Sequence, residues 1–232
     1  MKMKTIQFNI FKVVNLFNKR HICYFFIIYL FSLKYLIKKN QNVELYENNF
    51  NSLESKNQNR LINFEKFNNE TGSSEYLVPN IVHYICLEKN KIDFGHFLSI
   101  LSVYLNHNPL YIYIHCNECN FSHSKYWKML NKIGKLKSKL KIKRLIKFSN
   151  KIFGVEPEWI HHKSDVLRNL VLMSYGGIYL DNDVLVINSL NKYRKFEIVS
   201  SWDSDKDGVG SQVLIANRNA RFLRATFDLF RY

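Results

Sequence analysis

Residues 163–183 read KSDVLRNLVLMSYGGIYLDND, and this stretch decides the fold. Its apolar positions up to Ser174 recur at helical spacing, which predicts a helix. Gly176-Gly177 follows, and glycine takes the positive φ that the end of a helix needs. Ile178-Tyr179-Leu180 then begins a strand, and Asp181-Asn182-Asp183 ends it. The sequence therefore predicts a helix, a glycine turn and a strand that ends in two carboxylates.

Acidic side chains at this strand end predict a binding site for a cation. Two carboxylates one residue apart are poorly placed for a core, whereas Asp181 and Asp183 could hold a hard divalent cation that bridges a diphosphate. Asp165 and Arg168 lie three positions apart, so they share one face of the predicted helix and are expected at the same crevice. Taken alone, a D-x-D is usually a charged turn, and Asp165 with Arg168 could be a surface ion pair.

The run S-D-x-x-R followed by G-G-x-Y-x-D-x-D, residues 164–183, resembles the DXD glycosyltransferases of the sugar-binding-region family. That family includes α-1,4-galactosyltransferase-like and yeast α-mannosyltransferase-like proteins, and it is related to the clostridial glucosylating toxins. The resemblance implies a GT-A fold, an α/β nucleotide-sugar-binding sandwich with a mostly parallel central sheet. It also implies metal-dependent, retaining transfer of a sugar from a nucleotide-sugar, most often a UDP-sugar, to a hydroxyl of a glycan or glycolipid.

The same resemblance suggests a role for each residue of the motif. Asp183 resembles the direct metal ligand, and Asp181 resembles the residue that touches metal, ribose and sugar, with Mn²⁺ as the usual ion. These two are the expected catalytic and metal-binding residues. Asp165 and Arg168 resemble the pair that holds the hydroxyls of the donor sugar. Tyr179 resembles the motif tyrosine near the ribose, although core packing would explain it equally well.

An apolar run, Ile81–Cys86, is suited to a buried parallel strand and is the expected first strand. In the family this strand often ends H-Y-I-W, with the aromatic residue near the nucleotide base. Here it ends His83-Tyr84-Ile85-Cys86, and a cysteine cannot stack on uracil as an indole would. His83 and Tyr84 are expected among the donor-binding residues, although we expect the Tyr84 side chain to face the other way on the strand.

The rest of the chain alternates apolar strands with amphipathic segments, which favours an α/β domain with a parallel sheet. Further helices are expected at 94–106, 123–133, 158–175 and 219–230. Further strands are expected at 110–115, 140–148, 196–202 and 212–216, and residues 184–187 are expected to continue extended. The carboxyl ends of parallel strands are where ligands bind, and the acidic pair lies at one of those ends.

Upstream of this domain, residues 21–37 read HICYFFIIYLFSLKYLI, which predicts a transmembrane signal anchor. A helix of this length spans about 25 Å, slightly short for a typical bilayer. A signal peptide is the alternative, but no small-x-small cleavage site follows. We therefore expect a cytoplasmic tail at 1–20, a stem at 38–75 and a catalytic domain at 76–232, in a single-pass type II protein of Golgi or secretory-pathway membranes.

The net charge of +15 is compatible with nucleic acid, an anionic membrane or an anionic substrate. The basic run 132–147 lacks a recognisable nucleic-acid module, so a solvated face is favoured and no nucleic-acid partner is expected. Cys116-Asn-Glu-Cys119 has no second pair to complete a zinc site. Small residues after a strand are the favoured interpretation of this pair, and a disulfide stays open.

Two features near the C-terminus complete the expectations. Residues 203–208 resemble the start of a calcium loop, but the twelfth position is Leu214 instead of Glu, so an acidic loop beside the active site is favoured. Family members usually continue past the helix expected at 219–230, and that later segment shapes the acceptor side. The alternative function is therefore a catalytically weak or inactive membrane-anchored relative that binds nucleotide-sugars or glycans.

Overall fold

The computed structural model describes residues 62–64, 68–87, 90–145, 160–202 and 208–229. All of them belong to one compact unit, residues 53–232. Within these residues no helix is both long enough and apolar enough to cross a membrane. The tail predicted at 1–20, the anchor predicted at 21–37 and the acidic loop at 203–207 lie outside the described residues.

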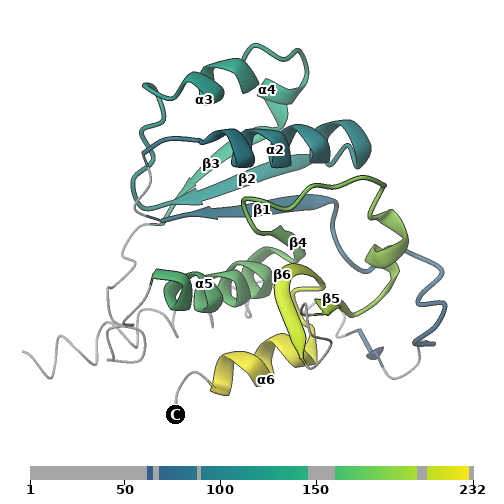
Figure 1. Cartoon of the computed structure of the whole chain (residues 1–232). Helices are drawn as coiled ribbons and strands as arrows, with labels where there is room; N and C mark the ends of the chain where they lie inside the picture. Colours follow the sequence, from purple (N-terminus) through teal and green to yellow (C-terminus); the bar gives the residue numbers. More distant parts are fainter. Residues whose placement is uncertain (1–61, 65–67, 88–89, 146–159, 203–207, 230–232) are drawn as a thin grey trace, which may run out of the picture. The chain divides into compact units, whose positions relative to one another are not determined.

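Six strands form one mixed sheet in the order β3-β2-β1-β4-β6-β5 (Figure 1). The parallel strands are β1 (Ile81–Cys86), β2 (Tyr111–Cys116), β3 (Leu140–Arg144) and β4 (Gly177–Leu180). Strand β6 (Val209–Ala216) returns antiparallel beside β4, and β5 (Ile198–Trp202) pairs antiparallel with β6. The expected α/β class with a mostly parallel sheet is confirmed.

Helices lie on both faces of the sheet (Figure 1). One face carries α2 (Phe94–Asn106), α3 (Lys125–Leu130) and α4 (Leu136–Lys139), and the other carries α5 (Ile160–Tyr175) and α6 (Arg221–Leu229). A short 3₁₀ helix, η4 (Asn191–Lys195), precedes β5. Asp93 begins α2 because its side chain accepts a hydrogen bond from the His96 backbone N–H at 2.9 Å.

The main apolar core lies on the α2 side of the sheet. Alternate residues of β1 and β2 point there, and Val82, Tyr84, Ile112 and Ile114 are all 0 % exposed. Their neighbours in sequence point to the α5 side, where the buried residues include His83. The sheet therefore separates an apolar layer from a layer with buried polar groups, and the site begins in the second layer.

Residues 184–187, which are expected to continue extended, do not pair with a strand of the sheet. Side chains of α2 satisfy their backbone instead. The Ser99 hydroxyl donates to Val184 O at 2.6 Å, the Val186 N–H donates to the Ser102 hydroxyl at 3.0 Å, and the Asn106 amide donates to Val186 O at 2.7 Å. Because α2 already pairs this segment, it needs no neighbouring strand.

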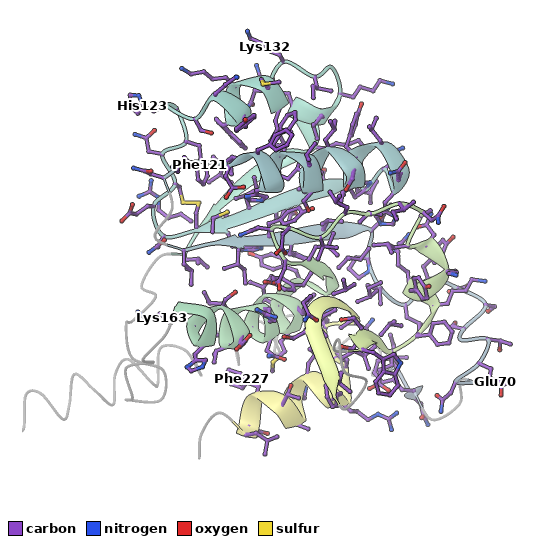
Figure 2. All side chains as sticks on the ribbon, viewed as in Figure 1. Glu70, Phe121, His123, Lys132, Lys163 and Phe227 are labelled. Carbon is purple, nitrogen blue, oxygen red and sulfur yellow. A yellow bond between two sulfur atoms is a disulfide. The ribbon has the colours of Figure 1, made fainter. Side chains whose placement is uncertain are left out.

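Cys116 and Cys119 are joined by a disulfide, with their Cα atoms 5.3 Å apart (Figure 2). The two residues follow a strand, as the favoured interpretation has it, and the disulfide that stayed open is the observed state. Cys116 is the last residue of β2, so the bridge closes the turn that follows that strand. Cys86 forms no disulfide within the described residues, and it is buried.

Described residues upstream of Tyr76 also contact this unit. Phe64 is buried, and the Ser73 backbone N–H donates to Lys195 O at 2.8 Å. Gly72, at a φ of +70°, turns the chain there, and a Cβ at this position would lie 2.7 Å from Lys195 O. Packing against η4 therefore begins before the predicted start of the catalytic domain.

Candidate functional site

Strand β4 begins at a glycine turn that only glycine can occupy. Gly176 and Gly177 have φ values of +63° and +123°. A Cβ on Gly177 would lie 2.6 Å from Ile81 O and 2.7 Å from His83 Nε2, so β1 approaches this backbone closely. The turn thus ends α5 and starts β4 directly beside β1, and the direction of β4 decides where its acidic end lies.

His83 fixes the same turn from beneath. Its Nε2 lies 2.8 Å from Gly176 O, and its Nδ1 lies 3.0 Å from His115 Nε2. A carbonyl only accepts, so His83 donates through Nε2, and in the neutral ring Nδ1 then accepts from His115 Nε2. Burial lowers the pKa of His83 to about 4, the Gly176 bond opposes this, and Lys143 adds to it. His83 is therefore an uncharged support of the turn.

The acidic turn at the other end of β4 is held by two neighbouring strands. The Asp181 backbone N–H donates to Gln212 O of β6 at 2.9 Å. The Asn182 amide donates to Ile85 O of β1 at 3.1 Å. The Val184 N–H closes the turn onto Asp181 O at 3.1 Å. Asp181 and Asp183 consequently lie at the carboxyl ends of β1 and β4, as the sequence suggested.

Arg168 connects this turn to α5. Its Nη2 lies 3.0 Å from Asp165 Oδ1 and 3.6 Å from Asp181 Oδ1. The guanidinium carbon lies 4.7 Å from the centre of the Tyr179 ring, and the Tyr179 hydroxyl donates to Asp181 Oδ1 at 2.5 Å. The structure therefore brings together four of the predicted residues: Asp165, Arg168, Tyr179 and Asp181.

Electrostatics differ between the members of this cluster. The side chain of Arg168 is 6 % exposed, and those of Asp165 and Asp181 are 36 % and 29 % exposed. Burial raises the pKa of Asp181, while the Tyr179 hydrogen bond and the charge of Arg168 oppose that rise. Burial also raises the pKa of Tyr179. Tyr179 thus stays a protonated donor, and the Arg168 charge favours the ionised form of Asp181.

Oxygen atoms suited to a hard cation are present at the turn. Asp183 is exposed, and its carboxylate has no hydrogen bond or ion pair with any described residue. The buried Asn182 Oδ1 also lacks a hydrogen-bond partner. No group of three or more His, Cys, Asp or Glu side chains gathers as a metal site within the described ranges. Two carboxylates and an amide oxygen fit a hard cation that shares its coordination sphere with a ligand's phosphates and water.

His83 and Tyr84 do not join the cluster. Both are 0 % exposed, and the Tyr84 hydroxyl lies 2.8 Å from the Ser99 hydroxyl on the α2 side of the sheet. Tyr84 and Cys86 are two positions apart, so they share one face, and our expectation that Tyr84 faces the other way was wrong. Cys86 is 1 % exposed within the core. A donor contact by His83 or Tyr84 remains a prediction that their burial does not support.

Sequence reasoning missed Ser211, the β6 residue that binds Arg168. Arg168 Nη1 donates to Ser211 O at 2.8 Å and to Ser211 Oγ at 2.5 Å. No local pattern marks a serine in a strand as the partner of an arginine on a helix earlier in the chain. The antiparallel return of β6 beside β4 is what brings them together.

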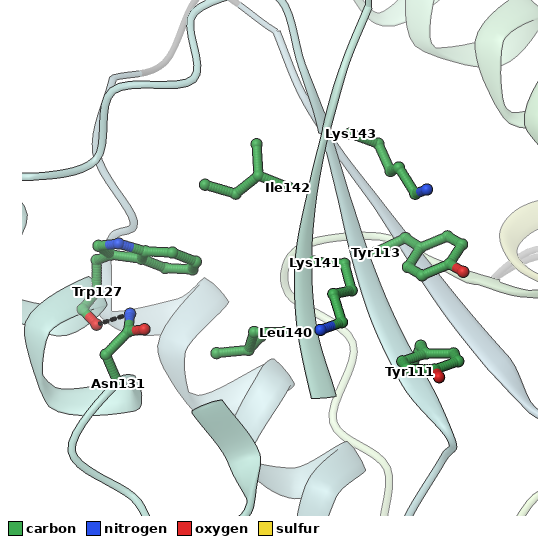
Figure 3. Close-up of a pocket in the computed structure, with 8 residues that line it drawn as sticks. All are labelled: Tyr111, Tyr113, Trp127, Asn131, Leu140, Lys141, Ile142 and Lys143. Carbon is green, nitrogen blue, oxygen red and sulfur yellow. Dashed lines mark hydrogen bonds between the residues drawn. The ribbon is translucent and has the colours of Figure 1, made fainter. Parts of the chain in front are cut away.

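A pocket of about 570 Å³ lies elsewhere, along the free edge of β3 (Figure 3). Tyr111, Tyr113, Lys141 and Lys143 lie on one side of that strand, and Trp127 and Ile142 lie on the other. Strands β2 and β1 separate β3 from β4, so this pocket is not part of the acidic turn.

The fold is an α/β sheet, and its carboxyl edge carries an acidic turn, an arginine and a tyrosine. These features are typical of α/β proteins that bind a cation and a diphosphate at that edge. The family model "Glycosyltransferase sugar-binding region containing DXD motif" matches residues 33–200, and the chain belongs to that family. The match includes α5 and the acidic turn, and it ends before β6.

The chain is also similar to individual proteins. It is 27 % identical to "Glucan organizing enzyme 1" of Cryptococcus neoformans var. grubii, over 63 % of this chain and 42 % of that protein. The chain therefore spans less than half the length of this curated relative. Similar solved structures are the PaToxG glycosyltransferase (TM-score 0.45, 15 % identity, 85 % of this chain and 70 % of that chain) and the galactosyltransferase LgtC (TM-score 0.41, 17 % identity, 62 % and 59 %).

Proposed function

We propose that this protein is a metal-dependent retaining glycosyltransferase that moves a sugar from a nucleotide-sugar, a UDP-sugar by preference, to a hydroxyl of a glycan or glycolipid. The observation that carries the proposal is the position of Asp181 and Asp183 at the carboxyl end of β4, where Asp181 pairs with Arg168 and Arg168 pairs with Asp165. Family membership supports sugar transfer, and the geometry supplies acidic groups for a cation and a diphosphate.

Asp181 and Asp183 would hold the cation, with Mn²⁺ as the first choice and the Asn182 amide oxygen nearby. A bound cation supplies neutralisation of the charge that develops on the departing diphosphate. Tyr179 and Arg168 both contact Oδ1 of Asp181, which leaves Oδ2 without a partner among the described residues. Asp165 is part-exposed and would accept hydrogen bonds from the donor sugar.

The transfer step needs no enzyme nucleophile. The bond between the anomeric carbon and the diphosphate oxygen breaks while the acceptor oxygen attacks from the same face. The proton of the acceptor hydroxyl passes to the departing diphosphate. Because attack and departure occur on the same face, this front-side displacement retains the anomeric configuration. The side chains named above would hold and orient the donor, and the acidic turn would hold the cation that neutralises the leaving group.

Asp183→Ala tests the proposal because Asp183 is exposed and contributes little to the fold. Full-length protein in detergent is assayed for nucleotide release from UDP-sugars with Mn²⁺. A lost metal contact should lower turnover roughly 100-fold or more, since a bound cation supplies several kcal/mol. The unfolding midpoint should stay unchanged, and Glu118→Ala, another exposed acid, should match the wild type in both measurements. Equal turnover in EDTA and in Mn²⁺ would exclude the metal-dependent mechanism.

One observation favours the alternative of a weak or inactive relative that binds nucleotide-sugars. Each guanidinium nitrogen of Arg168 already has a partner within the protein, whereas the family resemblance assigns this arginine to the donor sugar. Calorimetry with UDP-sugars and Mn²⁺ separates the two functions when it is paired with the release assay. Binding without turnover supports the alternative.

We place the protein in Golgi or secretory-pathway membranes as a single-pass type II protein. The apolar run at 21–37 supports an anchor, and the Cys116–Cys119 disulfide supports an oxidising compartment. Carbonate extraction of cell membranes tests the anchor, because an anchored protein stays in the pellet. Recovery of a soluble protein that begins near residue 40 would instead favour a cleaved signal peptide.

A further inference from the structure

All three nitrogens of the Arg168 guanidinium contact acceptors of this chain. Its Nε–H donates to Ser164 O at 3.4 Å, and its Nη2 serves Asp165 and Asp181. Its Nη1 serves both the carbonyl and the hydroxyl of Ser211. Each of its three nitrogens therefore has an acceptor within this chain, because Nη2 also donates to Ser164 Oγ at 3.5 Å. Arg168 therefore ties three elements together, namely α5, the acidic turn after β4, and β6.

Ser211 determines how this fork is oriented. The guanidinium is planar, so fixing Nη1 also fixes Nη2. The two Ser211 oxygens lie 2.8 Å and 2.5 Å from Nη1, and they come from a strand 43 positions further along the chain. The same strand holds Asp181 through Gln212 O at 2.9 Å. Strand β6 therefore holds both partners of this ion pair: Ser211 binds the Arg168 guanidinium, and Gln212 binds the backbone of Asp181.

We propose that Ser211 is a positioning residue for the candidate active site, and that its hydroxyl orients Arg168 against Asp165 and Asp181. The inference deepens the proposed function and rests on it. Without the hydroxyl, one Nη1 hydrogen loses its acceptor, and the guanidinium turns toward Ser211 O or toward water. Asp165 and Asp181 then lose the guanidinium that they share. The two carboxylates, which are proposed to meet the donor and the metal, are no longer held in a fixed position relative to each other.

The sharpest test compares Ser211→Thr with Ser211→Val, because threonine and valine have the same shape and differ in the hydroxyl. Ser201→Ala on β5 is a matched control, since that hydroxyl donates to Gln212 Oε1 and does not contact Arg168. Calorimetry of the full-length protein with UDP and Mn²⁺ should show about tenfold weaker binding for Ser211→Val, the size expected for one hydrogen bond to a charged group. Ser211→Thr and Ser201→Ala should lie within about twofold of the wild type.

Kinetics separate positioning from stability. In a UDP-sugar assay, Ser211→Val should raise KM for the donor and leave KM for the acceptor unchanged. A residue with a purely structural role would lower the unfolding midpoint and leave UDP binding unchanged at temperatures where the protein is folded. That result, or equal binding by Ser211→Thr and Ser211→Val, overturns the inference.

A second readout keeps the inference testable if the proposed function fails. In protein labelled with ¹⁵N-arginine, the Arg168 side chain should give slowly exchanging N–H signals, assigned with Arg168→Lys. Those signals should persist in Ser211→Thr and be lost in Ser211→Val. A wild type that neither binds nor turns over nucleotide-sugars refutes the proposed function alone. Arg168 signals that are unchanged in Ser211→Val refute the positioning role alone.

Discussion

The polar groups at the two ends of strand β4 differ in burial and in charge. At its start, His83 and His115 are buried without charge, and Gly176 and Gly177 leave no room for another side chain. At its end, Asp165, Arg168 and Asp181 form ion pairs, and the two acids stay partly exposed. A strand of four residues, Gly177–Leu180, joins the two ends.

The difference shows how rigidity and chemistry are divided along one strand. Neutral, buried and sterically fixed groups at the start set the direction of β4, so changes there should affect folding first. Charged groups at the end keep oxygen atoms available to ligands, so changes there should affect binding first. Buried charge is costly unless it is paired, which explains why Arg168 serves both acids.

The strongest effect is expected at the glycine turn. In Gly177→Ala, the Cβ would lie 2.6 Å from Ile81 O at a φ of +123°, so β1 and β4 would have to separate. We expect a loss of about 3 kcal/mol or more in the free energy of unfolding, measured by urea denaturation. In Gly134→Ala, where nothing lies within 4 Å of the new Cβ, the change should stay within about 0.5 kcal/mol. Similar losses for both variants would remove the contrast between the two ends of β4.

The next effect is expected at the charged end. Arg168→Met keeps the unbranched stem of the side chain and removes the guanidinium, which leaves Asp165 and Asp181 without the positive charge between them. Because both acids are partly hydrated, we expect a loss of about 2 kcal/mol in the free energy of unfolding, below the full cost of a buried unpaired charge. Arg144→Met, at an exposed position of β3, serves as the control and should change little. A larger loss for Arg168→Met than for Gly177→Ala would reverse the assignment of roles.

A smaller effect should follow from the histidines when the pH is lowered. The pKa of His83 is lowered to about 4 by burial, whereas in the unfolded chain it lies near 6.5. Between these values the unfolded state binds more protons, so stability must fall as the pH drops from about 6.5 toward 4. The slope contributed by His83 is at most about 1.4 kcal/mol per pH unit. Urea denaturation at several pH values should show a flatter slope for His83→Gln, in which His115 still contributes.

The smallest effect is expected at an ion pair remote from both ends of β4. Glu197 Oε1 accepts from the Arg221 backbone N–H at 2.7 Å at the start of α6, and Oε2 lies 2.7 Å from Arg221 Nη2. Burial raises the pKa of Glu197, but its bonds to Arg221 outweigh burial and lower it overall. Its stabilisation is present above the unfolded pKa of about 4.5 and is lost as the pH falls through the lower folded value. Glu197→Gln should cost about 1 kcal/mol at pH 7 in thermal or urea unfolding. If Glu197→Gln does not lower the free energy of unfolding, the ion pair between Glu197 and Arg221 contributes nothing to stability.

The sequence predicted correctly those elements whose determining residues lie next to each other in the chain. Helix α2 occurs at the predicted residues 94–106, because its apolar spacing and the Asp93 cap are encoded next to each other. The acidic turn and its approach to Asp165 and Arg168 followed from one continuous motif. The position of Ser211 did not, because it depends on the pairing of β6 with β4, and the burial of His83 depends on a carbonyl 93 positions away.

Strand β6 also fixes when the site can form during synthesis. The outer edge of β4 has β6 as its partner, and residues 181–208 must leave the ribosome before that strand does. Until then β4 presents unpaired backbone groups that another strand could capture, and Arg168 has no Ser211 to bind. The pairing of β6 with β4 therefore closes the sheet edge and orients Arg168 in the same step of co-translational folding. A delay in elongation just before β6 would prolong the period in which both are unfinished.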